Sequence, residues 1–171
     1  MSTIAVIETE PESHTLLRAN DPAPVTVLNA TARANAVIVC DHGGDAVPEA
    51  LNGLGLDAAI RARHIAWDIG AADVARRLSD RLAMPAVLAG YSRLVIDLNR
   101  PLDDLTSIRE ISDGVAIPGN RRLTAGDIEA RAAEIFRPYH EAVTAALATC
   151  PIAVPAVISI HSFTPVMKGF E

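Results

Sequence analysis

Short apolar runs, most of them rich in β-branched residues, recur along the chain between polar or proline-containing segments. Runs of this length that are bounded by turn-forming residues are typical of buried strands. The pattern therefore predicts a strand in each of five segments: residues 25–29, 37–40, 86–89, 94–98 and 156–160.

Longer segments between these runs carry helical patterns and residues that favour helix starts. Asp57 is placed to cap a short helix, because its carboxylate can accept the free amide hydrogens of the first turn. Asp68 can cap the next helix, at about residues 69–83, in the same way. A capping-box pattern at residues 124–127 opens a long helix, which we expect to be kinked near Pro138.

The order of these elements predicts the fold class. Strands that alternate with helices indicate an α/β domain, in which helices flank a mainly parallel or mixed sheet in three layers. Ligand sites in such sheets gather at the carboxyl ends of the strands. Residues whose side chains can bind a ligand or take part in catalysis follow three of the predicted strands. We expect them to share one edge of the sheet: His42, Asp45, Asn99, Arg100 and His161.

Length and composition limit the possible classes of protein. The chain has 171 residues, half of them apolar, so we expect one α/β domain over residues 1–171, with residues 1–24 as an irregular approach segment. The formal net charge of −6 argues against nucleic-acid binding, since phosphates need clusters of Lys and Arg. Two cysteines are too few for a disulfide framework, and no apolar run approaches about 18 residues. We expect a cytoplasmic protein that contacts no membrane, and its oligomeric state stays open.

His42 and Asp45 stand three residues apart across Gly43 and Gly44, which allow the backbone to bend until both side chains point at one centre. Such a short pattern also occurs by chance in ordinary loops. Together with His161, however, the pair supplies two imidazoles and a carboxylate, a zinc-binding set that leaves one position for water. Zinc there could lower the pKa of that water and polarise a substrate carbonyl, so the sharper hypothesis is a hydrolase.

Other polar residues near the predicted strand ends have supporting tasks. Arg93 and Arg100 could grip a substrate carboxylate or neutralise an oxyanion, and Asn99 would add an amide donor. Asp97 is expected to anchor a neighbouring arginine or amide. Asp68, besides capping a helix, could accept a hydrogen bond from a metal-bound imidazole, and Asp41 could do the same.

Several motifs together resemble the N-formylglutamate amidohydrolase family: HGGD at 42–45, YSRLVIDLNRP at 91–101, PGN at 118–120, PYH at 138–140 and HSF at 161–163. The resemblance covers about residues 35–171, and SRLVIDLNRP is its most specific part. This family is similar in fold to zinc carboxypeptidases and aspartoacylase-type deacylases, so the resemblance implies a zinc-exopeptidase-like (phosphorylase/hydrolase-like) fold.

Site roles also follow from this resemblance. It implies that His42, Asp45 and His161 bind Zn²⁺. Asn99 and Arg100 would then clamp the substrate carboxylate, and Arg93 would polarise the carbonyl. The implied substrate is a small acidic N-acyl amino acid, N-formyl-L-glutamate first, which is cleaved to formate and glutamate in histidine degradation.

The chain departs from the family pattern in two places. Asp45 stands where the carboxypeptidase pattern has Glu, which shortens the ligand arm by one methylene. Family members also continue well past the HSF segment, and their relatives take the general-base glutamate from that later region. We therefore expect the C-terminal part of the family domain, with the general base, to lie beyond Glu171. Two alternatives stay open: a deacylase of another N-acyl amino acid, and a noncatalytic metal- or ligand-binding domain.

Overall fold

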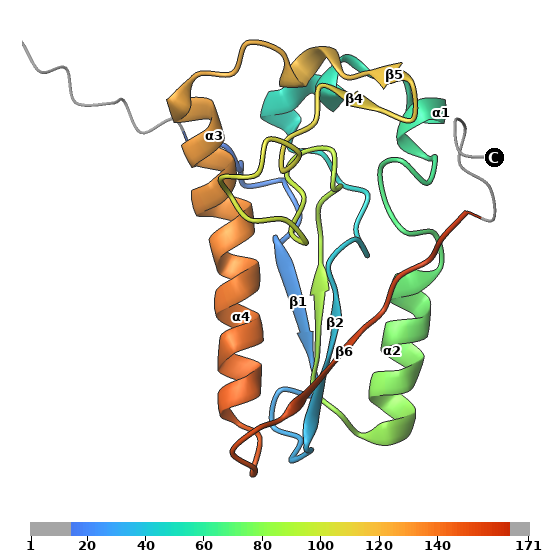
Figure 1. The fold of residues 1–171 in the computed structure, drawn as a ribbon, viewed down its shortest axis with the longest axis vertical. Helices are drawn as coiled ribbons and strands as arrows, with labels where there is room; N and C mark the ends of the chain where they lie inside the picture. Colours follow the sequence, from blue (N-terminus) through green and yellow to red (C-terminus); the bar gives the residue numbers. More distant parts are fainter. Residues whose placement is uncertain (1–14, 165–171) are drawn as a thin grey trace, which may run out of the picture.

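A mixed four-stranded sheet forms the centre of the protein in the computed structural model, which describes residues 15–164 (Figure 1). The strand order is β1-β3-β2-β6, where β2 runs parallel to both β3 and β6, and β1 is an antiparallel edge strand. This arrangement confirms the predicted α/β class with a mixed sheet. The strands are β1 (Val25–Leu28), β2 (Ala36–Cys40), β3 (Ala86–Ala89) and β6 (Ala156–Ser159).

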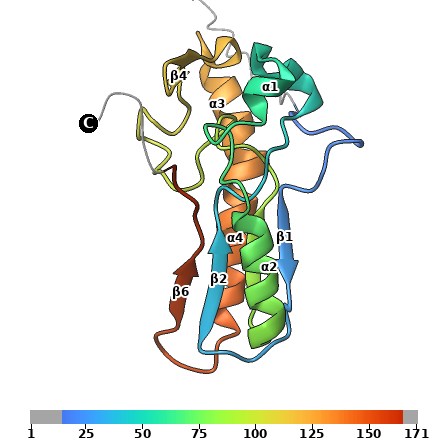
Figure 2. The same cartoon turned by 90° about the vertical axis from the view of Figure 1, so that its right-hand side faces the viewer.

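Helices cover both faces of the sheet, so the predicted three layers are present (Figures 1 and 2). Helix α4 (Arg137–Ala148) packs on one face, and α2 (Ala71–Leu82) packs against β2 and β3 on the other. The remaining elements gather at one end, around the carboxyl ends of β2 and β3: the 3₁₀ turn η1 (Glu49–Gly55), α1 (Ala58–Arg61), the hairpin β4 (Ile111–Ser112) and β5 (Val115–Ala116), the 3₁₀ turn η2 (Pro118–Asn120), α3 (Ala125–Arg131) and the π-helical turn η3 (Ala132–Phe136).

Burial explains which runs became central strands. All five residues of β2 and all four of β3 are buried, as expected for parallel strands covered on both faces. Two clusters of apolar side chains form the core. One lies between the sheet and α4 and includes Ile135 and Tyr139, and the smaller one lies under α2 and includes Ala71 and Ala75. Strand β6, in contrast, is exposed along its whole length at the edge of the sheet.

The helix starts follow the sequence signals with one exception. Asp57 caps α1 by accepting a hydrogen bond from the Ile60 amide at 2.8 Å, and Thr124 with Asp127 forms the predicted capping box of α3. The prediction that Asp68 caps α2 is wrong, because Gly70 occupies that position and the Asp68 side chain turns towards two histidines instead.

Two further expectations need correction or refinement. Residues 94–98 form no strand, although they are fully buried. Side chains of Asn120 in η2 and Arg131 in α3 satisfy main-chain carbonyls there, so no strand ladder is needed. Near Pro138, where a kink was expected, the structure has the π-helical turn η3 between α3 and α4. Within the predicted approach segment, residues 15–24 contain no helix or strand, and residues 1–14 lie outside the described part.

Candidate metal centre

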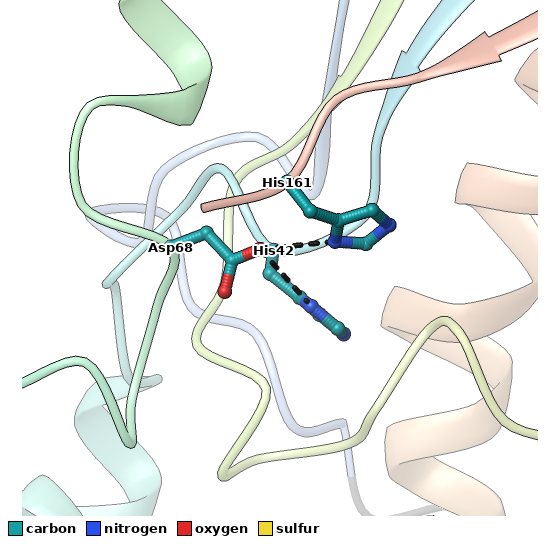
Figure 3. A group of neighbouring side chains, drawn as sticks. All are labelled: His42, Asp68 and His161. Atoms are coloured by element: carbon teal, nitrogen blue, oxygen red, sulfur yellow. Dashed lines mark hydrogen bonds and ion pairs between the residues drawn. The ribbon is translucent and has the colours of Figure 1, made fainter. Parts of the chain in front are cut away.

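Three side chains from distant parts of the sequence meet at the carboxyl ends of β2 and β6. His42 follows β2, His161 follows β6, and Asp68 lies in the loop before α2 (Figure 3). One ligand atom of each residue lies within 4.8 Å of the ligand atoms of the other two. We call this group the His–Asp–His cluster. The expectation that His42 and His161 share one edge of the sheet is confirmed.

Main-chain hydrogen bonds explain why these residues meet. Strands β2 and β6 are parallel neighbours in which Val39 faces Ser159, and the Ile160 amide donates to the Val39 carbonyl at 2.9 Å. The two histidines that follow therefore leave the sheet side by side, with ring centroids 5.2 Å apart. The Asp68 amide donates to the His42 carbonyl at 2.9 Å, which draws the loop before α2 against the same edge.

The predicted partner Asp45 is not part of the cluster, and we correct the third member to Asp68. Asp45 is exposed, on the far side of the two glycines. Gly44 has a different task from the expected bend: a Cβ at this position would stand 2.2 Å from the main chain of Gly90. The glycine therefore lets the loop after β2 approach the residue after β3 closely, and Ala46 then pairs with Tyr91 in a parallel bridge.

The donor atoms of the three side chains lie close enough together to bind one metal ion. Nδ1 of His161 lies 2.9 Å from Oδ2 of Asp68, and Nδ1 of His42 lies 3.7 Å from the same oxygen. The second distance is too long for a hydrogen bond, and Nδ1 of His42 is buried without a hydrogen-bond partner. Buried polar atoms rarely stay unsatisfied, so this nitrogen points to a group that binds between the three side chains.

The other ring nitrogen of His42 is held by a buried carboxylate. Nε2 of His42 lies 2.6 Å from Oδ1 of Asp97, and Oδ2 of Asp97 accepts a hydrogen bond from Arg93 at 2.8 Å. A histidine that binds a metal usually donates its second N–H to a carboxylate, which fixes the tautomer that leaves the first nitrogen free. The contact with Asp97 assigns this arrangement to His42, and the expected Asp97–arginine anchor is confirmed.

The second imidazole has a weaker set of supports. Nε2 of His161 lies 2.9 Å from the hydroxyl oxygen of Ser159 and 3.6 Å from Oδ2 of Asp41. The Tyr139 hydroxyl in turn donates to Oδ1 of Asp41. Asp41 therefore faces the outer nitrogen of His161, in the supporting position that the sequence had suggested for it.

Local charges keep the acids of the site ionised. Burial alone would lower the pKa of His42, but its contacts with Asp68 and Asp97 outweigh burial and raise that pKa. Burial opposes ionisation of both carboxyls, yet contacts with the imidazoles lower the pKa of Asp68 and of Asp97. Arg93 adds to this effect at Asp97. At neutral pH the cluster therefore presents a carboxylate to a cation.

These residues fit a zinc ion better than a hard cation. Two imidazole nitrogens and one carboxylate oxygen form a three-ligand set that is common for zinc in catalytic sites, whereas Mg²⁺ and Ca²⁺ prefer oxygen ligands alone. The unpaired Nδ1 of His42 and the ionised Asp68 provide the donor atoms in the form that metal binding requires.

The three residues expected to act on the substrate lie around the cluster in different ways. The Arg93 guanidinium is half-buried, and its Nη1 lies 3.7 Å from Oδ1 of Asp68. Asn99 and Arg100 lie two and three residues after Asp97 and are both exposed. The main-chain amide of Asn99 donates to Oδ1 of Asp97 at 3.0 Å. The structure therefore brings Arg93 to the cluster and leaves the side chains of Asn99 and Arg100 on the surface nearby.

Sequence reasoning missed two features of the site. Asp68 was considered as a helix cap and as an outer acceptor, because nothing in local spacing ties it to His42. Tyr139 belongs to the PYH motif, but its contact with Asp41 links residues 98 positions apart and has no signal in the sequence pattern. Both features depend on tertiary contacts.

Fold and site together define an α/β protein with a His–Asp–His candidate metal centre at the carboxyl ends of parallel strands. The sequence profile of the N-formylglutamate amidohydrolase family matches residues 34–171. The chain belongs to this family, a family of hydrolases named for an amide bond. The resemblance found from the motifs is thereby confirmed.

A solved structure supports the same fold. The crystal structure of gene product Atu2144 from Agrobacterium tumefaciens is 35% identical to this chain and superposes with a TM-score of 0.84. The match covers 88% of this chain and 61% of that one, so the chain spans about three fifths of the length of its structural relative. No curated protein sequence matches the chain. Among the described residues, no helix has the length and apolarity needed to cross a membrane.

Proposed function

We propose that the protein is a zinc-dependent amidohydrolase that cleaves N-formyl-L-glutamate, or a closely related N-acyl acidic amino acid, to formate and glutamate in histidine degradation. The observation that carries the proposal is the His–Asp–His cluster, with the buried and unpaired Nδ1 of His42 aimed at its centre. Family membership supports the reaction type. A cytoplasmic location would suit this role.

His42, Asp68 and His161 would hold the zinc, which when bound makes a water more acidic and polarises a carbonyl oxygen. The chain's own residues prepare the site for this. Asp97 holds the His42 ring in the tautomer that leaves Nδ1 free, and the low pKa of Asp68 keeps its carboxylate ionised.

Arg93 is our candidate for stabilising the oxyanion. One of its N–H groups is used by Asp97, which orients the guanidinium beside the cluster. A guanidinium has five N–H donors, and its partial exposure leaves others available for a substrate carbonyl. Asn99 and Arg100 are our candidates for the substrate carboxylate, because a planar guanidinium can hold a carboxylate with two parallel hydrogen bonds.

Formate release from N-formyl-L-glutamate by the purified protein in the presence of zinc tests the proposal. We expect turnover that a chelator abolishes, that added zinc restores and that His42→Ala lacks. A panel of N-acyl amino acids under the same conditions identifies the preferred acyl group. Turnover of another N-acyl amino acid without formate release would assign the protein to the deacylase alternative.

The substrate clamp has its own test. Arg100→Ala should raise KM for an acidic substrate far more than KM for a neutral analogue of the same length, because only the acidic substrate loses its partner. The matched control is Arg121→Ala, which removes a different exposed arginine. Equal effects of Arg100→Ala on both substrates would remove the clamp from the proposal.

A specific observation favours a second candidate, a noncatalytic metal-binding domain. Within residues 15–164, each carboxylate at the site is already engaged: Asp97 with His42, Asp41 with Tyr139, and Asp68 with His161. At least one oxygen of each carboxylate is therefore committed to a protein side chain rather than to water, which favours a binding role. Stoichiometric zinc binding without turnover of any substrate in the panel would favour this candidate.

A further inference from the structure

A buried polar network lies beneath the segment that carries Asp97. Leu94 and Val95 are buried but belong to no strand, so their carbonyls lack the ladder partners of a sheet. Two side chains from distant segments supply partners instead. Nδ2 of Asn120 donates to the Leu94 carbonyl at 2.8 Å, and Nη1 of Arg131 donates to the Val95 carbonyl at 2.9 Å.

These two side chains also bind each other and the loops around them. Nη1 of Arg131 donates to Oδ1 of Asn120 at 2.7 Å, and Nη2 donates to the Gly119 carbonyl at 3.0 Å. Nδ2 of Asn120 further donates to the Arg109 carbonyl at 2.7 Å. The network therefore ties the Asp97 segment to η2, to the long connection before it and to the C-terminal end of α3.

Arg131 is an unusual residue to bury so completely. It is 1% exposed, and its hydrogen bonds go to carbonyl and amide oxygens. Burial lowers its pKa to about 10, against the opposing effect of Asp127. A buried cation is costly, so an apolar side chain would serve better if this position needed only packing. The directed hydrogen bonds are what an apolar residue could not replace.

The network is two residues away from Asp97, whose contact with His42 fixes the tautomer of the imidazole ring. Val95 precedes Asp97, whose carboxylate lies 2.6 Å from Nε2 of His42. The Asp97 amide is fixed as well, since it donates to the Ser107 carbonyl at 2.7 Å. A shift of the 94–97 backbone would therefore move the Asp97 carboxylate relative to the imidazole.

The geometry points to Arg131 and Asn120 as positioning residues of the metal site, because they hold the backbone that aims Asp97 at His42. This inference rests on the proposed metal-binding role of His42. Arg131 and Asn120 lie outside the cluster and do not contact it, but by this inference they contribute to its zinc affinity. Loss of an outer partner of a metal ligand typically costs about 10- to 100-fold in affinity, and an indirect loss should lie near the lower end.

The test compares Arg131→Met with Arg137→Met, which removes an exposed arginine of α4 that pairs with Glu129. Two quantities are measured at a temperature at which both variants are folded by circular dichroism: zinc affinity by chelator competition, and the ¹⁵N shifts of the His42 ring in zinc-free protein. We expect Arg131→Met to weaken zinc about 10-fold and to shift the ring away from its single Nε2–H tautomer. Arg137→Met should change neither quantity.

Arg131→Lys provides a rescue test, because an ammonium group retains donors for the Val95 carbonyl and should recover part of the affinity. If Arg131→Met does not fold, Asn120→Ala decides by the same two measurements. Wild-type affinity and an unchanged His42 tautomer in the folded variant would overturn the positioning role. Failure of the wild-type protein to bind zinc at all would instead overturn the proposed function on which the inference rests.

Discussion

The two imidazoles of the cluster come from strands with very different surroundings. His42 follows β2, which is buried throughout, and its own side chain is 3% exposed. His161 follows β6, which is exposed throughout and, within residues 15–164, pairs with β2 alone. Asp97 holds His42 at 2.6 Å, whereas Asp41 lies 3.6 Å from His161.

This difference shows that the site has two halves. The half around His42 is built into the core of the fold, whereas the half around His161 is carried by an exposed strand. The buried half needs no metal to be held, because Asp97, Arg93 and the network of Arg131 and Asn120 fix it. The half around His161, on the exposed strand β6, depends on the β2–β6 pairing, on Ser159 and on the contact with Asp68. Changes near His42 should therefore cost both stability and metal affinity, and changes near His161 should cost mainly affinity.

The largest expected effect is the loss of a ligand. His42→Ala and His161→Ala should each abolish stoichiometric zinc retention, measured by elemental analysis after gel filtration. His42→Ala should also lower the free energy of unfolding of zinc-free protein by about 1–3 kcal/mol more, since it takes the imidazole partner away from the buried Asp97 carboxylate. His64→Ala, at a half-exposed histidine outside the cluster, is the control and should retain zinc. Equal stability losses for the two variants would contradict the comparison.

A matched pair of isoleucines tests the two strands directly. Ile38 of β2 and Ile158 of β6 face each other in the parallel pairing, but they are 0% and 37% exposed. Ile38→Ala should cost about 2–5 kcal/mol of stability, the usual range for a buried site. Ile158→Ala should cost less than about 1 kcal/mol, because less apolar surface is removed from contact. Urea unfolding measures both, and similar costs would show that β6 is as well packed as β2.

Asp97 and Asp41, the carboxylates that support the two histidines, should also differ in how much they contribute to zinc affinity. Asp97→Ala should weaken zinc binding by about 10- to 100-fold, as is typical when the partner of a metal-binding histidine is removed. Asp41→Ala should have a smaller effect, because its contact with His161 is longer and Ser159 can take its place. Chelator competition on both variants gives the order. A larger loss for Asp41→Ala would reverse the roles of the two supports.

The pH dependence of zinc binding is the smallest expected effect. Zinc binds neutral imidazole, and the pKa of His42 is raised in zinc-free protein. A proton therefore competes with zinc over the pH range below that raised pKa, and the affinity should decline as pH falls. Asp97→Ala removes one group that raises this pKa, so its decline should begin at lower pH. Isothermal titration at several pH values measures the zinc affinity of the wild-type protein and of Asp97→Ala. Identical pH dependence in the two proteins would show that Asp97 does not raise the pKa of His42.

The sequence was most informative where local signals decide the structure. The apolar runs of β2, β3 and β6, the cap of α1 and the capping box of α3 were all predicted, because each depends on residues close in the chain. The pairing of His42 with His161 was also predicted, since the carboxyl ends of neighbouring parallel strands share an edge.

The remaining features depend on contacts that no local pattern encodes. Residues 94–98 have the composition of a strand, but side chains from η2 and α3 satisfy their carbonyls in place of a ladder. Asp45 has the spacing of a ligand, but its loop packs against the chain after β3, where Asp45 is exposed and lies outside the cluster. Asp68 joins the cluster through a main-chain contact with His42, 26 positions earlier.

The most direct measurement for the central claim is zinc stoichiometry and affinity in the pair Asp68→Ala and Asp45→Ala. The two variants remove the same chemical group, one from the cluster and one from the exposed loop. We predict that Asp68→Ala loses stoichiometric zinc and that Asp45→Ala binds zinc like the wild-type protein. Zinc loss in Asp45→Ala with full retention in Asp68→Ala would contradict the His–Asp–His assignment.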